Sequence, residues 1–503
     1  MHMIRILPTR TLHNVLSRRA FLWRERVAFG YHPITPFHNA TTTMSHSGRS
    51  ASESPESPAA LAKRQKIQSL GDVISRKQPA AFGTFSIPAD QWTIFYGTKG
   101  NTNRINLSNA SEAELQHLSD ACQPATFGVN KEDVLDESYR KAGKMDVTDF
   151  ATNFDVINSG ILDVIRSELL EGHESNKAIK TELYKLNVYG KGAFFKPHKD
   201  TPRSTTMFGS LVIVFPTKHE GGALMLRHGG SEWMFDSAAK VRTQVDPSIA
   251  YIAFYSDVEH EVTPVTSGYR VTLTYNLYFA TEPINNIIPV IPAPSSTEIA
   301  FTTALSTLLS DKAFMEKGGI LGFGLQHEYP LDPKAGLGNL INCLKGSDAI
   351  IQRVCSQLSL QTDLHVIYED RDIEGKSPPF VMAKDIVDYS QDEGTGMTFG
   401  ERLIDCDGGQ RVAVTGPIAD EAAQHACTVY HSDDDIDDES ENDDDEFKDD
   451  YVVDVDWVTD LTKFTGTTSY VAFGNSPQMD CVYGNVCLLV HIGPPEDRTR
   501  HSN

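Results

Sequence analysis

The chain has 503 residues, of which 40% are hydrophobic, so its length suits two domains with tails and its composition allows a sizeable core. The formal net charge of −23 argues against direct nucleic-acid binding, because little on the chain would neutralise phosphates. No apolar run reaches the roughly 20 residues that a membrane-spanning helix needs, so we predict neither a nucleic-acid nor a membrane partner.

Residues 1–78 are expected to form a disordered tail. Residues 1–52 contain seven arginines and a single acid, Glu25, a composition typical of a mitochondrial transit peptide. The alternative is an upstream extension of the reading frame, with Met44 as the true start. Seven scattered cysteines without a C-x-x-C pair favour reduced thiols in an intracellular protein. Mitochondrial and cytoplasmic or nuclear locations both stay open.

Residues 79–180 have a mixed and then helical pattern, which predicts a region that supports the following domain. Ser111 and Glu114 have the spacing of a capping box at the start of a helix. Further along, apolar residues recur every four positions and predict a second helix. These residues are Ile157, Ile161, Ile165 and Leu169.

Residues 181–280 consist of short β-like runs separated by turn signals. The expected strands cover 182–189, 193–198, 210–216, 222–228, 231–236, 249–256, 260–265 and 269–279. About eight short strands of this kind suit a double-stranded β-helix, or jelly roll. The predicted fold class is therefore mainly β with flanking helices (α+β), with a jelly-roll core and a C-terminal α+β module.

The same region contains residues suited to a metal centre. His198 and Asp200 are two positions apart at the end of a predicted strand, so their side chains should project from one face. His260 begins a later strand. Two imidazoles and one carboxylate leave one face of an octahedral metal open, as in non-haem iron(II) oxygenases. A structural zinc site would need a fourth ligand and would leave no room for chemistry.

Arg270 begins the next strand and shares a face of that strand with Thr272. A planar guanidinium can bind a carboxylate through two parallel hydrogen bonds, and a neighbouring hydroxyl can add another. Tyr189, at the end of the strand 182–189, is a further predicted donor. These three residues therefore predict a site for the distal carboxylate of a dicarboxylate co-substrate.

These residues together resemble the 2-oxoglutarate and Fe(II)-dependent dioxygenases of the prolyl 4-hydroxylase type. The resemblance covers about 181–280 and consists of the pattern H-x-D…H-x9-R, with a tyrosine nine residues before the first histidine. The matching residues are His198, Asp200, His260, Arg270 and Tyr189. More narrowly, the segments 182–189, 194–203 and 254–262 look like a largely uncharacterised, mainly fungal branch of this family.

The resemblance implies Fe(II) bound by His198, Asp200 and His260, with 2-oxoglutarate as co-substrate and dioxygen as oxidant. It also implies that Arg270, helped by Tyr189 and Thr272, binds the distal carboxylate, and that ascorbate serves as a reductant. Animal collagen-type prolyl hydroxylases use lysine for that carboxylate. A proline substrate is therefore not implied, and the substrate is an unidentified protein or small molecule.

Four prolines in residues 281–297 predict a linker. The α+β module that follows, 298–495, should contain helices at 298–317 and 338–358, with a tail at 496–503. Its expected strands lie near 364–369, 410–415 and 485–492. We find no second set of metal-binding residues there, so the module is expected to be a support, a substrate clamp or a degenerate second barrel.

The segment 432–452 is expected to be a disordered acidic loop. Residues 433–450 contain thirteen acids and one lysine, which account for about half of the net charge. The functional alternative for this loop is a docking site for a basic protein partner.

We therefore predict a 2-oxoglutarate-dependent dioxygenase that hydroxylates a protein side chain, of the prolyl type, or a small molecule, with release of succinate and carbon dioxide. The competing hypothesis is a catalytically silent jelly-roll scaffold that docks basic partners through its acidic loop.

Overall fold

The computed structural model of the chain describes residues 57–74, 78–98, 100–129, 132–170, 177–280, 294–332, 336–370, 380–387, 399–415, 452–464 and 482–498. Within these ranges the chain forms a β-rich module in residues 80–280, here called the core module, and a second module after residue 294, here called the C-terminal module. The basic segment 1–52 and the acidic run 433–450 lie outside the described residues. None of the helices in these ranges is long and apolar enough to cross a membrane.

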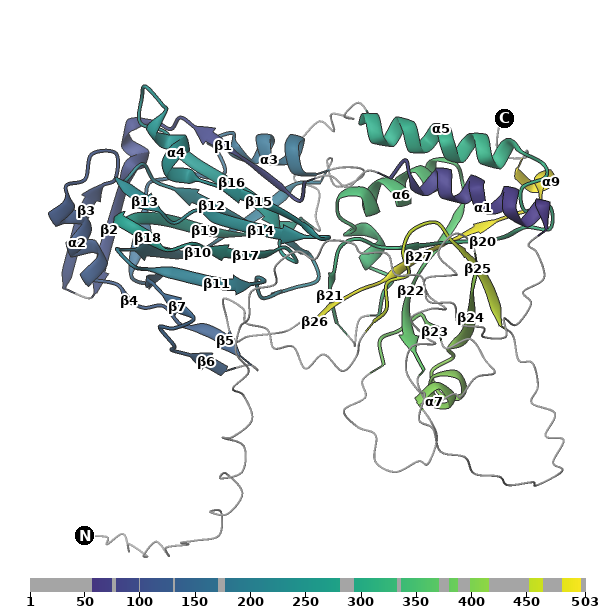
Figure 1. Cartoon of the computed structure of the whole chain (residues 1–503). Coiled ribbons are helices and arrows are strands. Elements are labelled where there is room, and N and C mark those ends of the chain that lie inside the picture. Colours follow the sequence, from purple (N-terminus) through teal and green to yellow (C-terminus); the bar gives the residue numbers. More distant parts are fainter. Residues whose placement is uncertain are drawn as a thin grey trace, which may run out of the picture. The chain divides into compact units, whose positions relative to one another are not determined.

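Two antiparallel sheets, layered face to face, form the core module (Figure 1). The larger sheet has seven strands in the order β1 (Ala80–Phe85), β16 (Ile249–Tyr255), β12 (Met207–Val214), β19 (Arg270–Phe279), β10 (Ile179–Tyr189), β8 (Gly143–Asp146) and β4 (Gln123–Pro124). The smaller sheet has five strands in the order β15 (Ser231–Phe235), β14 (Leu224–His228), β17 (Glu259–Val262), β11 (Phe194–His198) and β7 (Arg140–Lys141). The predicted mainly β, jelly-roll fold class is confirmed.

The central strands of the larger sheet are buried on both faces, which explains their continuous apolar sequences. Every residue of β16 is buried. The helices α3 (Ile161–Leu169) and α4 (Ser237–Arg242) contact β1 and β16 on the outer side of this sheet. The inner side faces the smaller sheet, and polar side chains there mark the site described below.

Shorter elements surround the two sheets. Small sheets pair β2 (Thr93–Thr98) with β3 (Asn101–Asn106) and β9 (Phe150–Thr152), β5 (Phe127–Val129) with β6 (Glu132–Val134), and β13 (His219–Gly221) with β18 (Val265–Gly268). The short helices are η1 (Ala89–Trp92) and α2 (Glu112–Asp120). The predicted capping box is present at α2, where the Ser111 hydroxyl accepts from the Glu114 amide and the Glu114 carboxylate accepts from the Ser111 amide at 2.8 Å.

The C-terminal module contains a closed barrel of six strands. In order around the barrel they are β20 (Gly319–Gly324), β25 (Val453–Trp457), β24 (Gln410–Thr415), β23 (Phe380–Ala383), β22 (Gln361–Glu369) and β27 (Cys487–Ile492). A further pair joins β21 (Tyr329–Leu331) to β26 (Val482–Gly484). The C-terminal module also contains the helices α5 (Ser296–Ser310), η3 (Leu340–Asn342), α6 (Gly346–Gln357), α7 (Phe399–Asp405) and α9 (Pro495–Arg498).

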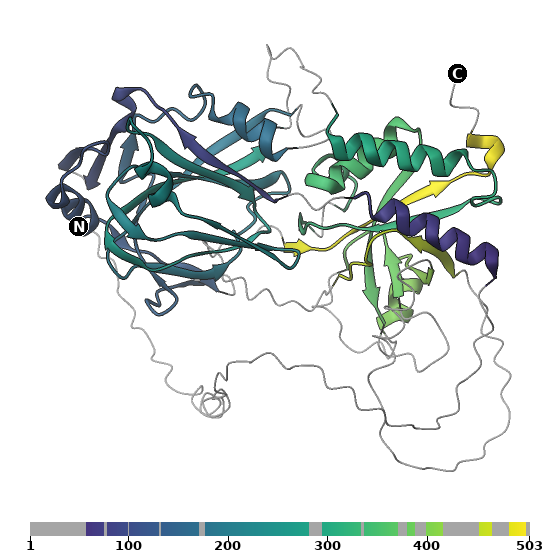
Figure 2. The ribbon, with the colours of Figure 1, turned by 45° about the horizontal axis from the view of Figure 1, so that its top comes forward.

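The structure differs from the predicted disordered tail 1–78, because α1 (Pro58–Gly71) is a helix that packs alongside α5 in the C-terminal module (Figure 2). Ile67 and Leu70 are buried in the same apolar cluster as Phe301 of α5. Lys63 of α1 also forms an ion pair of 2.5 Å with Asp456. Apolar burial against a distant part of the chain thus orders a segment whose own composition suggested disorder.

Three other expectations need correction. The region 79–180 is not mainly a helical support, since β1, β4 and β8 from this region are strands of the larger sheet. The helix predicted from the apolar repeat begins at Ile161, after Gly160 in a left-handed conformation, and Ile157 is 68% exposed. The predicted tail 496–503 begins with α9, where Arg498 donates to the carbonyls of Phe314 and Met315.

Replacing Ile67 by alanine should lower the free energy of unfolding by about 2–5 kcal/mol, because the side chain is fully buried against the C-terminal module. Gln65→Ala, at an exposed position of the same helix, is the control and should change stability by less than about 0.5 kcal/mol. Urea unfolding measures both values. Equal stabilities of the two variants would show that α1 does not pack as described.

Candidate active site

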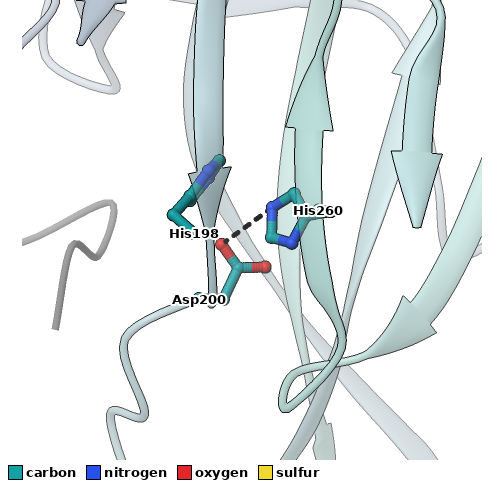
Figure 3. A group of neighbouring side chains, drawn as sticks. All are labelled: His198, Asp200 and His260. Atoms are coloured by element: carbon teal, nitrogen blue, oxygen red, sulfur yellow. Dashed lines mark ion pairs between the residues drawn. The ribbon is translucent and has the colours of Figure 1, made fainter. Parts of the chain in front are cut away.

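Strand pairing brings the two predicted histidines together. His198 ends β11 and lies directly opposite His260 of β17 in the antiparallel register. Asp200 follows two residues after β11. All three side chains are buried and point toward one another (Figure 3), and their ligand atoms lie within 4.8 Å of one another. The Asp200 Oδ1 atom is 3.8 Å from His260 Nε2.

Hydrogen bonds to the backbone fix the tautomers of both rings. The Nδ1 atom of His198 is 2.9 Å from the Lys196 carbonyl oxygen, and that of His260 is 3.0 Å from the Val258 carbonyl oxygen. A carbonyl oxygen can only accept, so each Nδ1 carries the proton and each Nε2 presents a lone pair. This arrangement is the usual support for metal-binding imidazoles.

The electrostatics at His198 favour a neutral imidazole. Burial lowers the pKa of His198 well below its ordinary value, and the neighbouring His260 lowers it further. The hydroxyl of Ser210 donates to the second carboxylate oxygen of Asp200 and orients it. Two neutral nitrogens and one carboxylate oxygen therefore converge on one point, and this donor set fits a divalent iron ion.

Arg270 has the features expected of an anion-binding residue. It is 1% exposed, and its Nε and Nη2 atoms are buried without a hydrogen-bond partner among the residues that the structure describes. Its guanidinium lies 5.5 Å from the centroid of the Tyr189 ring. Burial lowers the pKa of Arg270 from its ordinary value. Leaving such donors unsatisfied is costly, so the site fits a bound carboxylate.

A cavity joins the metal-binding residues to Arg270. Both sheets line it, including the predicted residues Tyr189 and Thr272. In the register of β10 and β19, Tyr189 lies opposite Arg270 and Asn187 lies opposite Thr272. The structure thus places all six predicted site residues around one cavity.

Four lining or supporting residues were missed in the sequence. Lys185 and Asn187 could have been found, because they alternate with Tyr189 along one strand and so share its face. Arg140 and Ser210 carried no such signal, since each reaches the site through pairing between distant strands. Arg203 does not line this cavity, and its guanidinium lies 4.4 Å from the centroid of the Tyr184 ring.

A second group with metal-like spacing consists of the partly exposed His228 and the buried Asp257 and His327. Here a cation is already present, because the Lys345 ammonium lies 2.8 Å from Asp257 Oδ1. Asp257 Oδ2 accepts from His327 Nδ1 at 3.0 Å and from the Glu328 amide at 3.1 Å. This group is therefore best described as an ion-pair network that joins the core module to the C-terminal module.

Opposing effects act on the Asp257 carboxyl. Burial alone would raise its pKa, but the positive charge of Lys345 and the bonds from the histidines hold the pKa well below its ordinary value. Asp257 lies in the turn between β16 and β17, three residues before His260. The network thus fixes the turn from which His260 enters the site.

Comparisons with known proteins agree with this geometry. Residues 184–278 match the model of the 2OG-Fe(II) oxygenase superfamily. A search of the curated proteins found no match. Among solved structures, the chain is similar to a prolyl-4-hydroxylase of Pseudomonas putida, with 18% identity over 42% of this chain and 99% of that chain and a TM-score of 0.24.

Two other solved structures are similar at the same level. One is a prolyl hydroxylase from Trichoplax adhaerens in complex with a hypoxia inducible factor oxygen degradation domain peptide fragment, with 15% identity over 44% of this chain and 94% of that chain and a TM-score of 0.24. The other is the viral collagen prolyl hydroxylase of Paramecium Bursaria Chlorella virus-1. It has 12% identity over 34% of this chain and 92% of that chain, with a TM-score of 0.22.

The core module has a jelly-roll layout, and the segment matched by the family model lies within it. More particularly, residues 184–278 are similar to the 2OG-Fe(II) oxygenase superfamily, which confirms the resemblance predicted from the motifs. At these identities and TM-scores the solved structures support no conclusion about the substrate.

Replacing Lys345 by methionine should lower the free energy of unfolding by about 3–5 kcal/mol, because Asp257 is left buried without its cation. The double variant Lys345→Met/Asp257→Asn should recover most of that loss. Lys199→Met is the matched control, since Lys199 pairs with Glu328 at 2.7 Å in a more exposed position and should cost about 0–1 kcal/mol. Urea unfolding of the four proteins measures these values, and an undiminished loss in the double variant would contradict this account.

Proposed function

We propose that this protein is an Fe(II)- and 2-oxoglutarate-dependent dioxygenase in which His198, Asp200 and His260 hold the iron. The observation that supports this most directly is the pair of free Nε2 lone pairs beside the Asp200 carboxylate, in the same cavity as a buried arginine without a partner. A metal ion requires the lone pairs and the carboxylate, and a dicarboxylate co-substrate requires the buried arginine. Their combination favours this class over a simple metal-binding protein.

Bound iron and 2-oxoglutarate would together supply the oxidising chemistry, with consumption of dioxygen and release of succinate and carbon dioxide. The side chains supply position and exclude water. Arg270 would bind the distal carboxylate through its unsatisfied nitrogens, and the hydroxyls of Tyr189 and Thr272 would assist. Because Arg270 is almost fully buried, this attraction is weakly screened and fixes the orientation of the co-substrate.

We further propose that the reaction is hydroxylation of a protein side chain or of a small molecule. Ascorbate, implied by the family resemblance, would return oxidised iron to the ferrous state. Succinate formed from 2-oxoglutarate in the presence of iron distinguishes this enzyme from the silent scaffold, which would form none.

Metal binding distinguishes the two His-Asp-His groups. Wild type should bind one Fe(II) or Mn(II) per chain, and His198→Ala should weaken that binding by at least about a hundredfold, because one of three ligands is lost. His228→Ala, from the second group, should weaken the binding far less than His198→Ala, because His228 acts on the metal-binding residues only through the turn before His260. Anaerobic titration calorimetry gives the affinities, and the reverse pattern would reject the site assignment.

Arg270→Gln should raise the KM for 2-oxoglutarate by about 10–100-fold, because the charge-assisted bonds to the distal carboxylate are lost. Uncoupled conversion of 2-oxoglutarate to succinate, without a second substrate, is the measurement. Arg203→Gln should leave this KM unchanged, since Arg203 does not line the cavity. An unchanged KM in Arg270→Gln would show that Arg270 does not anchor the co-substrate.

A further inference from the structure

Two cationic side chains in the cavity have no role in the function proposed above. Arg140 is 4% exposed and Lys185 is 8% exposed, and both line the cavity beside the metal-binding residues. Neither forms an ion pair with a carboxylate among the described residues. Buried cations without an anion are costly, so their presence indicates a ligand.

The Phe195 ring lies between Arg140 and the metal-binding residue His198. The Arg140 guanidinium lies 4.3 Å from the centroid of the Phe195 ring, and that ring stacks on His198 at 3.5 Å. Its Nη1 donates to the Thr126 carbonyl at 2.7 Å and its Nη2 to Asn187 Oδ1 at 3.1 Å, while its Nε has no acceptor. Both acceptors are neutral, so the charge of Arg140 is uncompensated.

Lys185 lies on the same face of β10 as Asn187 and Tyr189. Its ammonium has no hydrogen-bond acceptor among the described residues, and its nearest aromatic neighbour is the Tyr184 ring, with the centroid at 4.5 Å. Burial, with the like charges of nearby cations, lowers the pKa of Lys185 to about 8, and the Asp146 carboxylate, opposite Lys185 in the pairing of β10 with β8, offsets this only in part. A bound anion would relieve both effects.

The charges in the loaded cavity do not balance. Asp200 is the single acid among the described residues that line the cavity. The two charges of iron would cancel those of 2-oxoglutarate, and Asp200 would cancel Arg270. Arg140 and Lys185 then remain as two positive charges with no counterpart among the described residues that line the cavity.

Lys185 also lies at the opposite end of the cavity from the co-substrate anchor. In the paired strands, Tyr189 is opposite Arg270 and Lys185 is opposite Thr274. Four residues of extended strand separate Tyr189 from Lys185, which corresponds to about 13 Å. A diacid anchored at Arg270 therefore leaves Lys185 available for a second molecule.

We propose that Lys185, assisted by Arg140, binds an oxyanion such as a carboxylate on the substrate that is oxidised, so that the substrate is anionic. This inference rests on the function proposed above. It names the substrate class of the same site and identifies Lys185 as a specificity-determining residue.

Sulfate is a suitable probe, because it is an oxyanion that does not depend on the rest of the substrate. The full chain is loaded with Mn(II), an inert substitute for iron, and with 2-oxoglutarate, and sulfate is titrated by calorimetry at low ionic strength. Wild type should bind one sulfate. Lys185→Met should bind it at least about tenfold more weakly, and Lys185→Arg should stay close to wild type. Lys185→Met should also fold normally, because among the described residues the lysine forms no hydrogen bond or ion pair, and a methionine can still pack on the Tyr184 ring.

Lys144→Met is the matched control. Lys144 is on the neighbouring strand β8 and already lies 3.9 Å from Asp146, so its loss should change sulfate affinity by less than about twofold. The KM for 2-oxoglutarate in uncoupled turnover should be unchanged in Lys185→Met. Three results would each overturn the proposal: no sulfate binding by loaded wild type, equal affinity in Lys185→Met, or a raised KM for 2-oxoglutarate in that variant. Failure of the proposed function would be distinct, because wild type itself would then not bind 2-oxoglutarate.

Discussion

The pairing of β11 with β17 is the constraint on which the site depends. It places His198 directly opposite His260, and the alternation of side chains in a strand then sends both rings into the space between the sheets. A shift of one residue in either strand would turn one imidazole to the other face. The carbonyl groups that fix the tautomers come from Lys196 and Val258, each two residues before its histidine, so the same register also sets the direction of both lone pairs.

Charged and polar side chains follow one another in a fixed order along the sheet that faces His198 and His260. The inner face of the paired strands β10 and β19 carries a buried arginine at one end, hydroxyl and amide groups in the middle and a buried lysine at the other end. Apolar strands of the same sheet, such as β16, are covered by helices and give the sheet a rigid support. A site built on strands holds its side chains more firmly than one built on loops, because the backbone is fixed by hydrogen bonds on both sides.

Much of the core module could be predicted from the sequence, because its strands have clear period-two patterns and its site residues lie at strand ends. The shared face of Arg270 and Thr272 follows from alternation, and Tyr189 follows from its place at the end of a predicted strand together with the family pattern. Arg140 could not be predicted, since it reaches the site through the pairing of β7 with β11, and the sequence does not specify which distant strands pair. The helix α1 was missed because it has few apolar residues of its own, and most helical stability in proteins comes from packing. Ile157 was misassigned because Gly160, with φ +86°, delays the start of α3.

The position of α1 has a consequence for folding while the chain is being synthesised. This helix is made early by the ribosome, yet its buried face packs against α5 and the barrel that ends at Ile492. At typical rates of synthesis, roughly 20–80 seconds pass before that partner is complete. During this interval Ile67 and Leu70 have no native surface to cover them, and the core module must fold while this helix, still without its partner, is tethered to the first strand of the module. The nascent protein therefore passes through a period in which this helix is open to chaperones and to misplaced contacts.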